Sequence, residues 1–308
     1  MRSFRSPRWV RRVLASLAVL IVLLALAVGG LWLYLHPSIE RIDGIVYGRR
    51  GARPLTMDIL RPHSPNGIAI ALMVSGGWRS KKAGETPVFL VAPLIRAGYT
   101  VFAICHISQP DSTVMEIIGD MNRGVRFVRH HAKEYRIDPK RIGVTGGSAG
   151  GHLSLMLATR GGPGDPVAPD PVDRESSSVQ AAAIFYPVTD LLNLGPSTEN
   201  PGDGGPPISF RKAFGPDSMN MPIWKLIGHD SSPIYYVTPA MPPVLIYHGD
   251  ADTLVPLEQS QRFRARAKEV GIEVPLVVHA GGGHGWPTQL FDLWKFVEWF
   301  DRHLLHGT

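Results

Sequence analysis

Three side chains in this sequence have the types and the order that nucleophilic acyl chemistry needs: Ser148, Asp252 and His284. Ser148 is the centre of Gly146-Gly147-Ser148-Ala149-Gly150, which fits the pattern G-x-S-x-G. A serine hydroxyl attacks a carbonyl when a histidine takes its proton, and that histidine needs an acid to hold its tautomer. Because the pentapeptide alone often occurs by chance, the prediction depends on the acid and the histidine.

The residues on either side of Ser148 predict a strand, a tight turn and a helix. Residues 142–145 form an apolar, β-branched run with Ile142, Val144 and Thr145, and glycines then surround the serine in residues 146–151. Because glycine lacks a Cβ, the chain can turn sharply there and leave the hydroxyl exposed. The alternative interpretation is a glycine-rich connection in which the serine has no chemical role.

Backbone N–H groups that could stabilise a negative oxygen are predicted at two places. Ala149 opens the helix after the serine, so its N–H points outward from a helix N-terminus. Gly77 and Trp78 belong to a glycine turn, residues 75–78, that follows the apolar run 68–74. We therefore expect an oxyanion hole formed by the N–H groups of Gly77, Trp78 and Ala149. The alternative for residues 75–78 is a simple turn.

The acid and the histidine each follow a predicted strand, so the chain order is Ser, Asp, His. Open α/β sheets place their ligand sites at the carboxyl ends of the strands, where both residues are expected. Asp252 is preferred to Asp250 as the acid, because Asp250 comes directly after the strand and suits the backbone of the turn. Three further histidines near this edge are expected to make structural hydrogen bonds: His152, His248 and His279.

Apolar runs alternate with helical patterns along the rest of the chain. Strands are predicted at 42–47, 55–60, 68–74, 99–105, 141–145, 181–188, 243–247 and 274–279. Helices are predicted at 87–96, 118–135, 260–270 and 290–305, with a loop at 161–177. This alternation is typical of βαβ units, and it predicts an α/β fold with a doubly wound, mostly parallel sheet. Residues 38–308 are expected to form one catalytic domain.

Residues 191–235 interrupt the regular pattern. They are rich in Gly, Pro and Asn and carry scattered large apolar side chains without a helical or strand period. A long stretch of this kind inside a compact domain is often a lid or a binding element. We expect a lid or cap insertion here; the alternative is a plain surface excursion.

The N-terminus combines a basic flank, residues 1–12, with an uncharged apolar run, residues 13–35. The run is long enough to cross a bilayer as a helix, and aromatic residues stand near its far end. We expect a signal anchor with its N-terminus in the cytoplasm and the catalytic domain outside, and hence a single-pass protein of the cell membrane. The alternative is a signal peptide cleaved near Ala25-Leu26-Ala27, which would make the protein secreted.

Charge and motif content argue against several other classes of function. Five of the six net positive charges come from Arg2, Arg5, Arg8, Arg11 and Arg12, so the remainder has no basic field for nucleic acid. The glycines around Ser148 do not fit G-x-G-x-x-G, and no P-loop lysine follows them. No H-E-x-x-H motif and no metal-spaced Cys/His set occurs, so we expect neither a metal nor a cofactor. Cys105 is the only cysteine, which excludes an internal disulfide.

Several short motifs together resemble the α/β-hydrolase superfamily. More narrowly, the chain is similar to small serine esterases of the hormone-sensitive-lipase-like and feruloyl/acetyl-xylan esterase-like branch. The resemblance runs from about Tyr47 to the end of the chain. It is carried by Leu55-Thr56-Met57-Asp58, Ser75-Gly76-Gly77-Trp78, Asp138-Pro139-Lys140-Arg141-Ile142, Gly146-Gly147-Ser148-Ala149-Gly150-Gly151, Tyr186-Pro187, His248-Gly249-Asp250-Ala251-Asp252, Val255-Pro256 and Gly283-His284-Gly285.

The resemblance implies an α/β-hydrolase fold with Ser148 as nucleophile, His284 as base and Asp252 as acid. It also implies an oxyanion hole from Gly77, Trp78 and Ala149, and a small-molecule or carbohydrate ester as substrate. One position departs from the pattern, because this branch usually has a histidine where the chain has Ser75. That histidine shapes the oxyanion loop and does not donate to the oxyanion.

Together these observations predict a serine hydrolase that cleaves carboxylic esters through an acyl-enzyme, without a cofactor. Two alternatives stay open. The same site could serve a peptidase, an amidase or an acyltransferase of this fold. The chain could instead be a hydrolase-like binding protein without catalytic activity.

Overall fold

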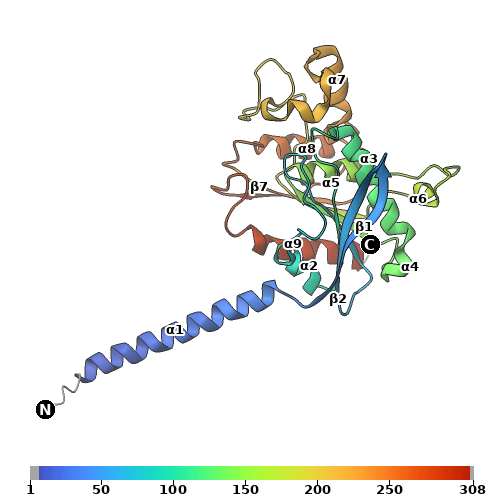
Figure 1. The fold of residues 1–308 in the computed structure, drawn as a ribbon. Coiled ribbons are helices and arrows are strands. Elements are labelled where there is room, and N and C mark those ends of the chain that lie inside the picture. The colour runs from blue at the N-terminus through green and yellow to red at the C-terminus, as the bar shows by residue number, and fades with distance from the viewer. Residues whose placement is uncertain (1–6, 306–308) are drawn as a thin grey trace.

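The computed structural model describes residues 7–305, so Arg2 and Arg5 of the basic flank lie outside the described residues. The first element is the 28-residue helix α1 (Arg8–Leu35), none of whose residues is buried. At 1.5 Å per residue it is about 42 Å long, enough to cross a hydrocarbon core of about 30 Å. Within the described chain it is the one helix long and apolar enough to span a membrane, a property that N-terminal signal sequences share. It extends away from the globular body (Figure 1).

Eight strands of the described chain form one sheet in the order β1-β2-β4-β3-β5-β6-β7-β8. They are β1 (Ile39–Arg50), β2 (Arg53–Pro62), β3 (Ala69–Met73), β4 (Thr100–Ile104), β5 (Ile142–Gly147), β6 (Ala181–Phe185), β7 (Val244–Gly249) and β8 (Leu276–His279). β1 and β2 form an antiparallel hairpin that pairs antiparallel with β4, and all pairs from β4 to β8 are parallel. The predicted α/β class with a mostly parallel sheet is confirmed.

Helices cover both faces of the sheet, as a doubly wound fold requires (Figure 1). One face packs against α3 (Val114–His130), α5 (Ala149–Arg160) and α8 (Glu258–Glu269), and this layer encloses the larger apolar core. The other face packs against η1 (Val88–Val91), α2 (Ala92–Arg96) and α9 (Gln289–Phe300), which enclose a second core. Along β3, Ala69 and Ala71 face the first core and Ile70 faces the second, which is the alternation expected of a strand buried on both sides.

Helix α3 illustrates how local sequence fixes an element. Thr113 caps its N-terminus, because its hydroxyl accepts the N–H of Glu116 while the Glu116 carboxylate accepts the N–H of Thr113. The predicted apolar stripe from Ile118 onward is buried as expected, and this capping box adds a turn before it. The short helix α4 (Ala132–Tyr135) follows, and the chain leaves it through Arg136 in the left-handed conformation.

Two segments predicted to lack regular structure contain short helices. Residues 161–177 include α6 (Pro171–Arg174), and residues 191–235 include η2 (Ile208–Phe214), η3 (Pro216–Met219), α7 (Met221–Asp230) and η4 (Pro233–Tyr236). α6, η3, α7 and η4 each carry proline in their first turn, where its missing N–H costs nothing. Each is too short to show a helical period, which explains why the apolar residues of 191–235 looked irregular.

Candidate active site

Ser148 occupies the turn between β5 and α5, with φ 55° and ψ −122°. This left-handed backbone is strained for a residue with a Cβ, at a cost of about 1–3 kcal/mol. The turn is held by two backbone bonds, from Ser148 N–H to Phe185 O (3.1 Å) and from Gly150 N–H to Ser75 O (3.1 Å). A Cβ at Gly146 would lie 2.5 Å from the carbonyl oxygen of Gly150, so the turn can be this tight only with glycine there.

The structure brings together the three side chains whose order suggested acyl chemistry. Asp252 follows β7 and His284 follows β8, at the same sheet edge as Ser148. His284 Nε2 lies 2.8 Å from Ser148 Oγ, and His284 Nδ1 lies 2.7 Å from Asp252 Oδ2. When Nδ1–H donates to the carboxylate, Nε2 is free to accept the serine proton. This geometry matches the reach required of a nucleophile, a base and an orienting acid.

Asp252 is held as an anion inside the protein. Its side chain is buried, and Oδ1 accepts the N–H groups of Leu254 (3.0 Å) and Val255 (2.9 Å). Burial alone would raise the pKa of this carboxyl, but hydrogen bonds from His248, His284 and Val255 outweigh it and hold the pKa well below its usual range. The negative charge needed beside an imidazolium is therefore present.

The neighbouring polar residues have structural partners. Asp250 is exposed, and its Oδ1 accepts the N–H of Gly281 (2.7 Å), so it joins the loops after β7 and β8. His248 is buried and lies 2.7 Å from both Ser260 Oγ and Val255 O, which fixes the loop that carries Asp252. His279 stacks on Trp286 with ring centroids 4.7 Å apart.

The turn at residues 76–79 presents the other predicted N–H donors. Gly76 and Arg79 exchange backbone bonds of 2.9 and 3.0 Å, and the two residues between them have positive φ, 56° for Gly77 and 55° for Trp78. Among residues 7–305 we find no acceptor for the N–H groups of Gly77, Trp78 or Ala149. These three donors are thus available to a ligand, which is the condition an oxyanion hole must meet.

A histidine that the sequence analysis missed lies beside this turn. His106 Nε2 is 3.0 Å from Ser75 Oγ, and His106 Nδ1 is 2.9 Å from Ile107 O. Burial lowers the pKa of His106 to about 4, although the Ile107 carbonyl opposes the shift, so the ring is neutral near pH 7. Nδ1–H then donates to Ile107 and Nε2 accepts the Ser75 hydroxyl. The His106 imidazole therefore reaches Ser75 from the end of β4. Ser75 is the position at which the esterases that the motifs resemble usually carry a histidine.

Trp78 ties the same turn to the segment 191–235. Its Nε1–H donates to His152 Nδ1 (3.2 Å), and His152 Nε2–H donates to Ser231 O (2.6 Å). Burial lowers the pKa of His152 to about 4, so this ring is also neutral. The indole makes edge contacts with Phe210 and Phe214, with centroids 5.4 and 5.3 Å apart. The predicted donors are therefore positioned by α5 and by residues of the predicted cap.

Tyr186 was also missed, and it supports the histidine of the site. Its ring packs on His284 with centroids 4.6 Å apart, and its hydroxyl accepts a bond of 2.9 Å from Gln289 Nε2. Tyr186 has φ 32°, so the chain turns sharply after β6 and brings the ring toward the elbow, the turn of residues 146–150 around Ser148. The sequence showed a Tyr-Pro pair here but gave no sign of this contact.

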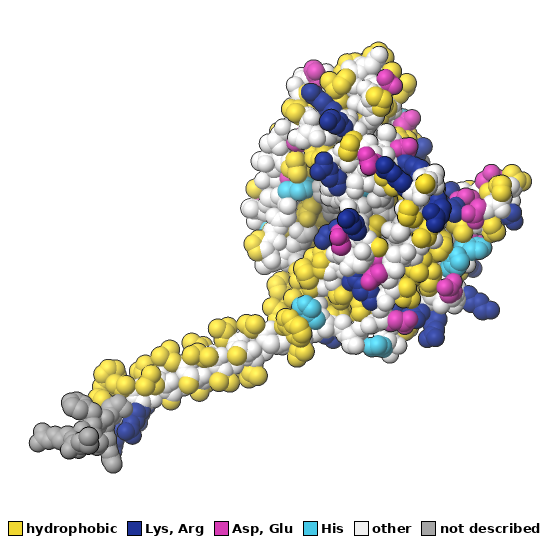
Figure 2. Space-filling view, in the orientation of Figure 1, with side chains coloured by type: hydrophobic (Ala, Val, Ile, Leu, Met, Phe, Trp, Pro, Cys, Tyr) yellow, Lys and Arg dark blue, Asp and Glu magenta, His cyan; other side chains and the backbone are white. Residues whose placement is uncertain are grey.

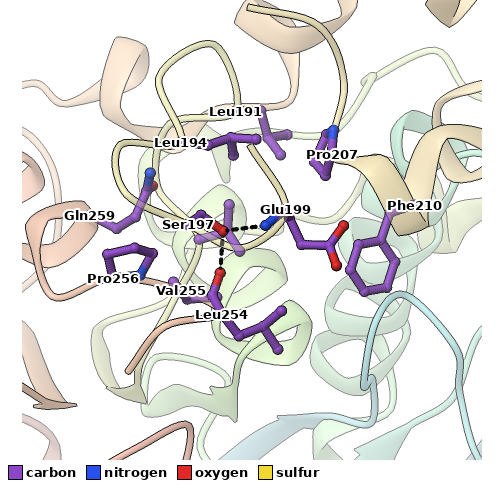
Figure 3. Close-up of a pocket in the computed structure, with 11 residues that line it drawn as sticks. Leu191, Leu194, Ser197, Glu199, Pro207, Phe210, Leu254, Val255, Pro256 and Gln259 are labelled. Carbon is purple, nitrogen blue, oxygen red and sulfur yellow. Dashed lines mark hydrogen bonds between the residues drawn. The ribbon is translucent and has the colours of Figure 1, made fainter. Parts of the chain in front are cut away.

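Figure 3 shows a small cavity between the segment 191–235 and the loop that carries Asp252. Its volume is about 40 Å³, and most of its lining is apolar. Ser197 Oγ donates to Leu254 O (2.6 Å) and accepts the N–H of Glu199 (3.1 Å), which fastens one side of the cavity to the loop. Phe210 closes the other side and contacts Gly77, where an added Cβ would lie 2.8 Å from its ring.

Comparisons with known proteins place the chain among esterases. Residues 57–267 match the family model BD-FAE. Esterase LipQ of Mycobacterium tuberculosis is 30% identical over 246 residues, which are 77% of this chain and 56% of LipQ. The acetylxylan esterase of Xylanibacter ruminicola is 28% identical over 244 residues, 79% of this chain and 44% of that enzyme. The chain thus spans about half the length of the curated relatives it matches.

Solved structures give the same picture of the fold. A truncated carbohydrate esterase from gut microbiota superposes with a TM-score of 0.69 and 27% identity, over 86% of this chain and 96% of that chain. The apo form of Thermogutta terrifontis esterase 2 superposes with a TM-score of 0.64 and 26% identity, over 88% of this chain and 94% of that chain.

Proposed function

Because the chain belongs to the BD-FAE family, we propose that it is a carboxylic ester hydrolase whose nucleophile is Ser148. The observation that carries this proposal is the unbroken set of hydrogen bonds from Ser148 Oγ through His284 to Asp252. Esterases among the relatives and the solved structures support it and agree with the resemblance drawn from the motifs.

The reaction follows from the placement of each group. Ser148 Oγ attacks the ester carbonyl carbon while His284 Nε2 takes the hydroxyl proton, and Asp252 stabilises the imidazolium. The N–H groups of Gly77, Trp78 and Ala149 bind the oxyanion of the tetrahedral intermediate. His284 then protonates the leaving alcohol, and the C–O bond to it breaks. Water, deprotonated by His284, attacks the acyl-enzyme and releases the acid and free Ser148.

Ser148→Ala in the full chain tests the assignment directly. We expect p-nitrophenyl acetate hydrolysis to fall by at least about 10³-fold, because the variant keeps the oxyanion donors but loses the nucleophile. A fluorophosphonate probe should label the wild type and leave the variant unlabelled. Equal turnover by the two proteins would refute the proposal, and absence of labelling in the wild type would favour a binding protein.

The same site could in principle serve another acyl transfer. A matched aminoacyl amide and an acceptor alcohol, each assayed beside the chromogenic ester, separate hydrolase from amidase, peptidase and acyltransferase. We expect ester cleavage to dominate, because proteins similar to this chain are named acetylxylan esterase and carbohydrate esterase. The substrate class we propose is accordingly a small-molecule or carbohydrate ester.

We further propose that α1 is an uncleaved anchor with its N-terminus in the cytoplasm and the body outside. Arg8, Arg11 and Arg12 precede the apolar run, and Trp32 and Tyr34 stand near its end, as the positive-inside rule and the aromatic belt require. Protease added to sealed inverted membranes should leave the body intact. Digestion of the body there would reverse the orientation, and a mature chain that begins after Ala27 would identify a cleaved signal.

Residues 191–235 are proposed to act as the cap over the site. Phe210 and Phe214 contact Trp78, and Phe210 also lines the cavity beside the loop that carries Asp252. Enlarging this cavity by Phe210→Ala should therefore change the preference for acyl chain length. Unchanged rates across an acetate-to-octanoate series would contradict a role as cap.

A further inference from the structure

A group of exposed apolar side chains lies on the two elements that cover one face of the sheet. Phe89 and Leu90 belong to η1, while Phe291 and Trp294 belong to α9 and are 53% and 41% exposed. We call these four residues the docking face. Single exposed apolar residues are ordinary on a protein surface, but a cluster marks a place that another apolar body covers.

The docking face is continuous with the end of α1. Trp294 stacks on Tyr34, with ring centroids 5.5 Å apart. Arg96 of α2 lies over the Tyr34 ring, and its guanidinium donates to Leu33 O (2.5 Å) and Tyr34 O (2.8 Å) in the last turn of α1. In Figure 2, hydrophobic side chains continue from α1 onto the adjoining part of the body.

These contacts set the level at which the docking face meets the membrane. Aromatic residues at the end of a membrane-spanning helix sit among the lipid headgroups. A ring stacked on Tyr34 must sit at the same level, and Phe291 is one turn from Trp294 on α9. We propose that the docking face inserts into the headgroup region of the bilayer that α1 spans and holds the body against it. This inference rests on the proposed anchoring by α1.

A cavity adjoins the docking face and shares a residue with it. It has a volume of about 460 Å³ and lies between η1–α2 and α9. Its lining includes Leu90, Leu94, Leu290 and Leu293, and Leu90 is at once part of the docking face and of this lining. Gly147, the residue before Ser148, also lines this cavity. Contact with the bilayer would therefore orient the body with this side of the elbow toward the lipid.

Depth-dependent quenching of a fluorophore on the full chain tests the docking face. A nitrobenzoxadiazole probe is placed at Phe291→Cys in a Cys105→Ala background, in phosphatidylcholine vesicles that contain spin-labelled lipid. Val167→Cys is the matched control, because Val167 is an apolar residue that is 83% exposed beside α6, and α6 packs on α3 at the opposite face of the sheet. We expect the spin-labelled lipid to quench the fluorophore at position 291 and to leave the fluorophore at position 167 unquenched.

A third probe separates failure of this inference from failure of the anchor. Leu24→Cys lies in the middle of α1, so quenching there by deep spin labels reports membrane insertion alone. Quenching at 24 without quenching at 291 would overturn the docking face and leave the anchor standing, whereas quenching at neither would overturn both. If the probe at position 291 were protected from water at high protein concentration regardless of the lipid, a second copy of the chain would cover the docking face. That result would also overturn the proposal. Unchanged melting temperatures verify that the labelled chains are folded.

Discussion

At the scale of the residue, the loop after β7 gives different roles to two aspartates that are two positions apart in the sequence. Asp252 is buried and accepts two backbone N–H groups besides the bond to His284, whereas Asp250 is exposed and accepts Gly281 N–H. Only Asp252 can therefore orient His284 and offset its charge.

Asp252→Asn keeps the shape of the side chain and removes its charge. We expect kcat for a soluble ester to fall on the order of 10³–10⁴-fold, because the amide no longer stabilises the imidazolium. Asp250→Asn is a surface substitution that should change the free energy of unfolding by no more than about 0.5 kcal/mol. We expect it to alter kcat by about twofold at most. Steady-state kinetics of the two variants check this. Similar losses in both would mean that the acid has been assigned to the wrong residue.

The residues of the site differ in how far sequence could identify them. Ser148, Asp252 and His284 were identifiable because each follows a strand and their order is chemically meaningful. His106 follows the strand predicted at 99–105 directly, so the same reasoning could have selected it. Tyr186 could not be selected, because its contact with His284 depends on a sharp turn that no local pattern encodes.

At the scale of the element, the elbow depends on close approach of β5, α5 and the loop after β3. A Cβ at Gly150 would lie 2.5 Å from Met73 O, and because that oxygen belongs to the backbone it cannot move aside cheaply. Gly150→Ala should lower the free energy of unfolding by about 1–3 kcal/mol and displace Ser75 and the turn at residues 76–79. Chemical denaturation and kcat measure both effects.

Gly119→Ala is the matched control for that experiment. Gly119 is an exposed position in α3, and a Cβ there would meet nothing within 4 Å. The substitution should stabilise the protein by about 0.5–1 kcal/mol through helix propensity, with kcat unchanged. If Gly150→Ala behaved like Gly119→Ala, the packing of the elbow would be looser than the geometry requires.

The neutral imidazole of His152 in α5 connects Trp78, in the turn at residues 76–79, with Ser231 at the end of α7. His152→Leu fills the space but leaves the Trp78 indole N–H and the Ser231 carbonyl without partners, at about 1–3 kcal/mol each. We expect lower stability and a lower kcat with little change in KM, since the affected group positions oxyanion donors. His152→Gln retains an acceptor and a donor and should recover part of both losses. A fall in stability with kcat intact would limit His152 to a purely structural role.

Elements were predictable where periodicity was strong. The strands buried on both faces appeared as continuous apolar runs, and α3 appeared as a stripe of apolar residues three and four apart. The helices within residues 191–235 were not predictable, because they are only one to three turns long. They contact the rest of the fold through isolated side chains such as Trp224. Such contacts are tertiary and leave no repeat in the chain.

At the scale of the whole molecule, the apolar N-terminal run and the catalytic body were both visible in sequence, but their junction was not. The stacking of Tyr34 on Trp294 joins residues 260 positions apart, and the bonds from Arg96 close the end of α1 onto α2. Neither contact follows from hydropathy. In the membrane-anchored arrangement that we propose, this junction sets how the body stands on the bilayer, so the docking face can be recognised only in the folded chain.

Two buried neutral histidines make the stability of the whole molecule depend on pH. Burial lowers the pKa of His106 and of His152 to about 4, below the ordinary value of 6.5. Between these values the unfolded chain binds protons that the folded chain does not, so the free energy of unfolding falls as pH decreases from 6.5 to 4. Each histidine contributes on the order of 3 kcal/mol to this fall. Denaturant titrations across this range should show a shallower pH dependence in the double variant His106→Gln, His152→Gln. An unchanged slope would mean that other groups carry the effect.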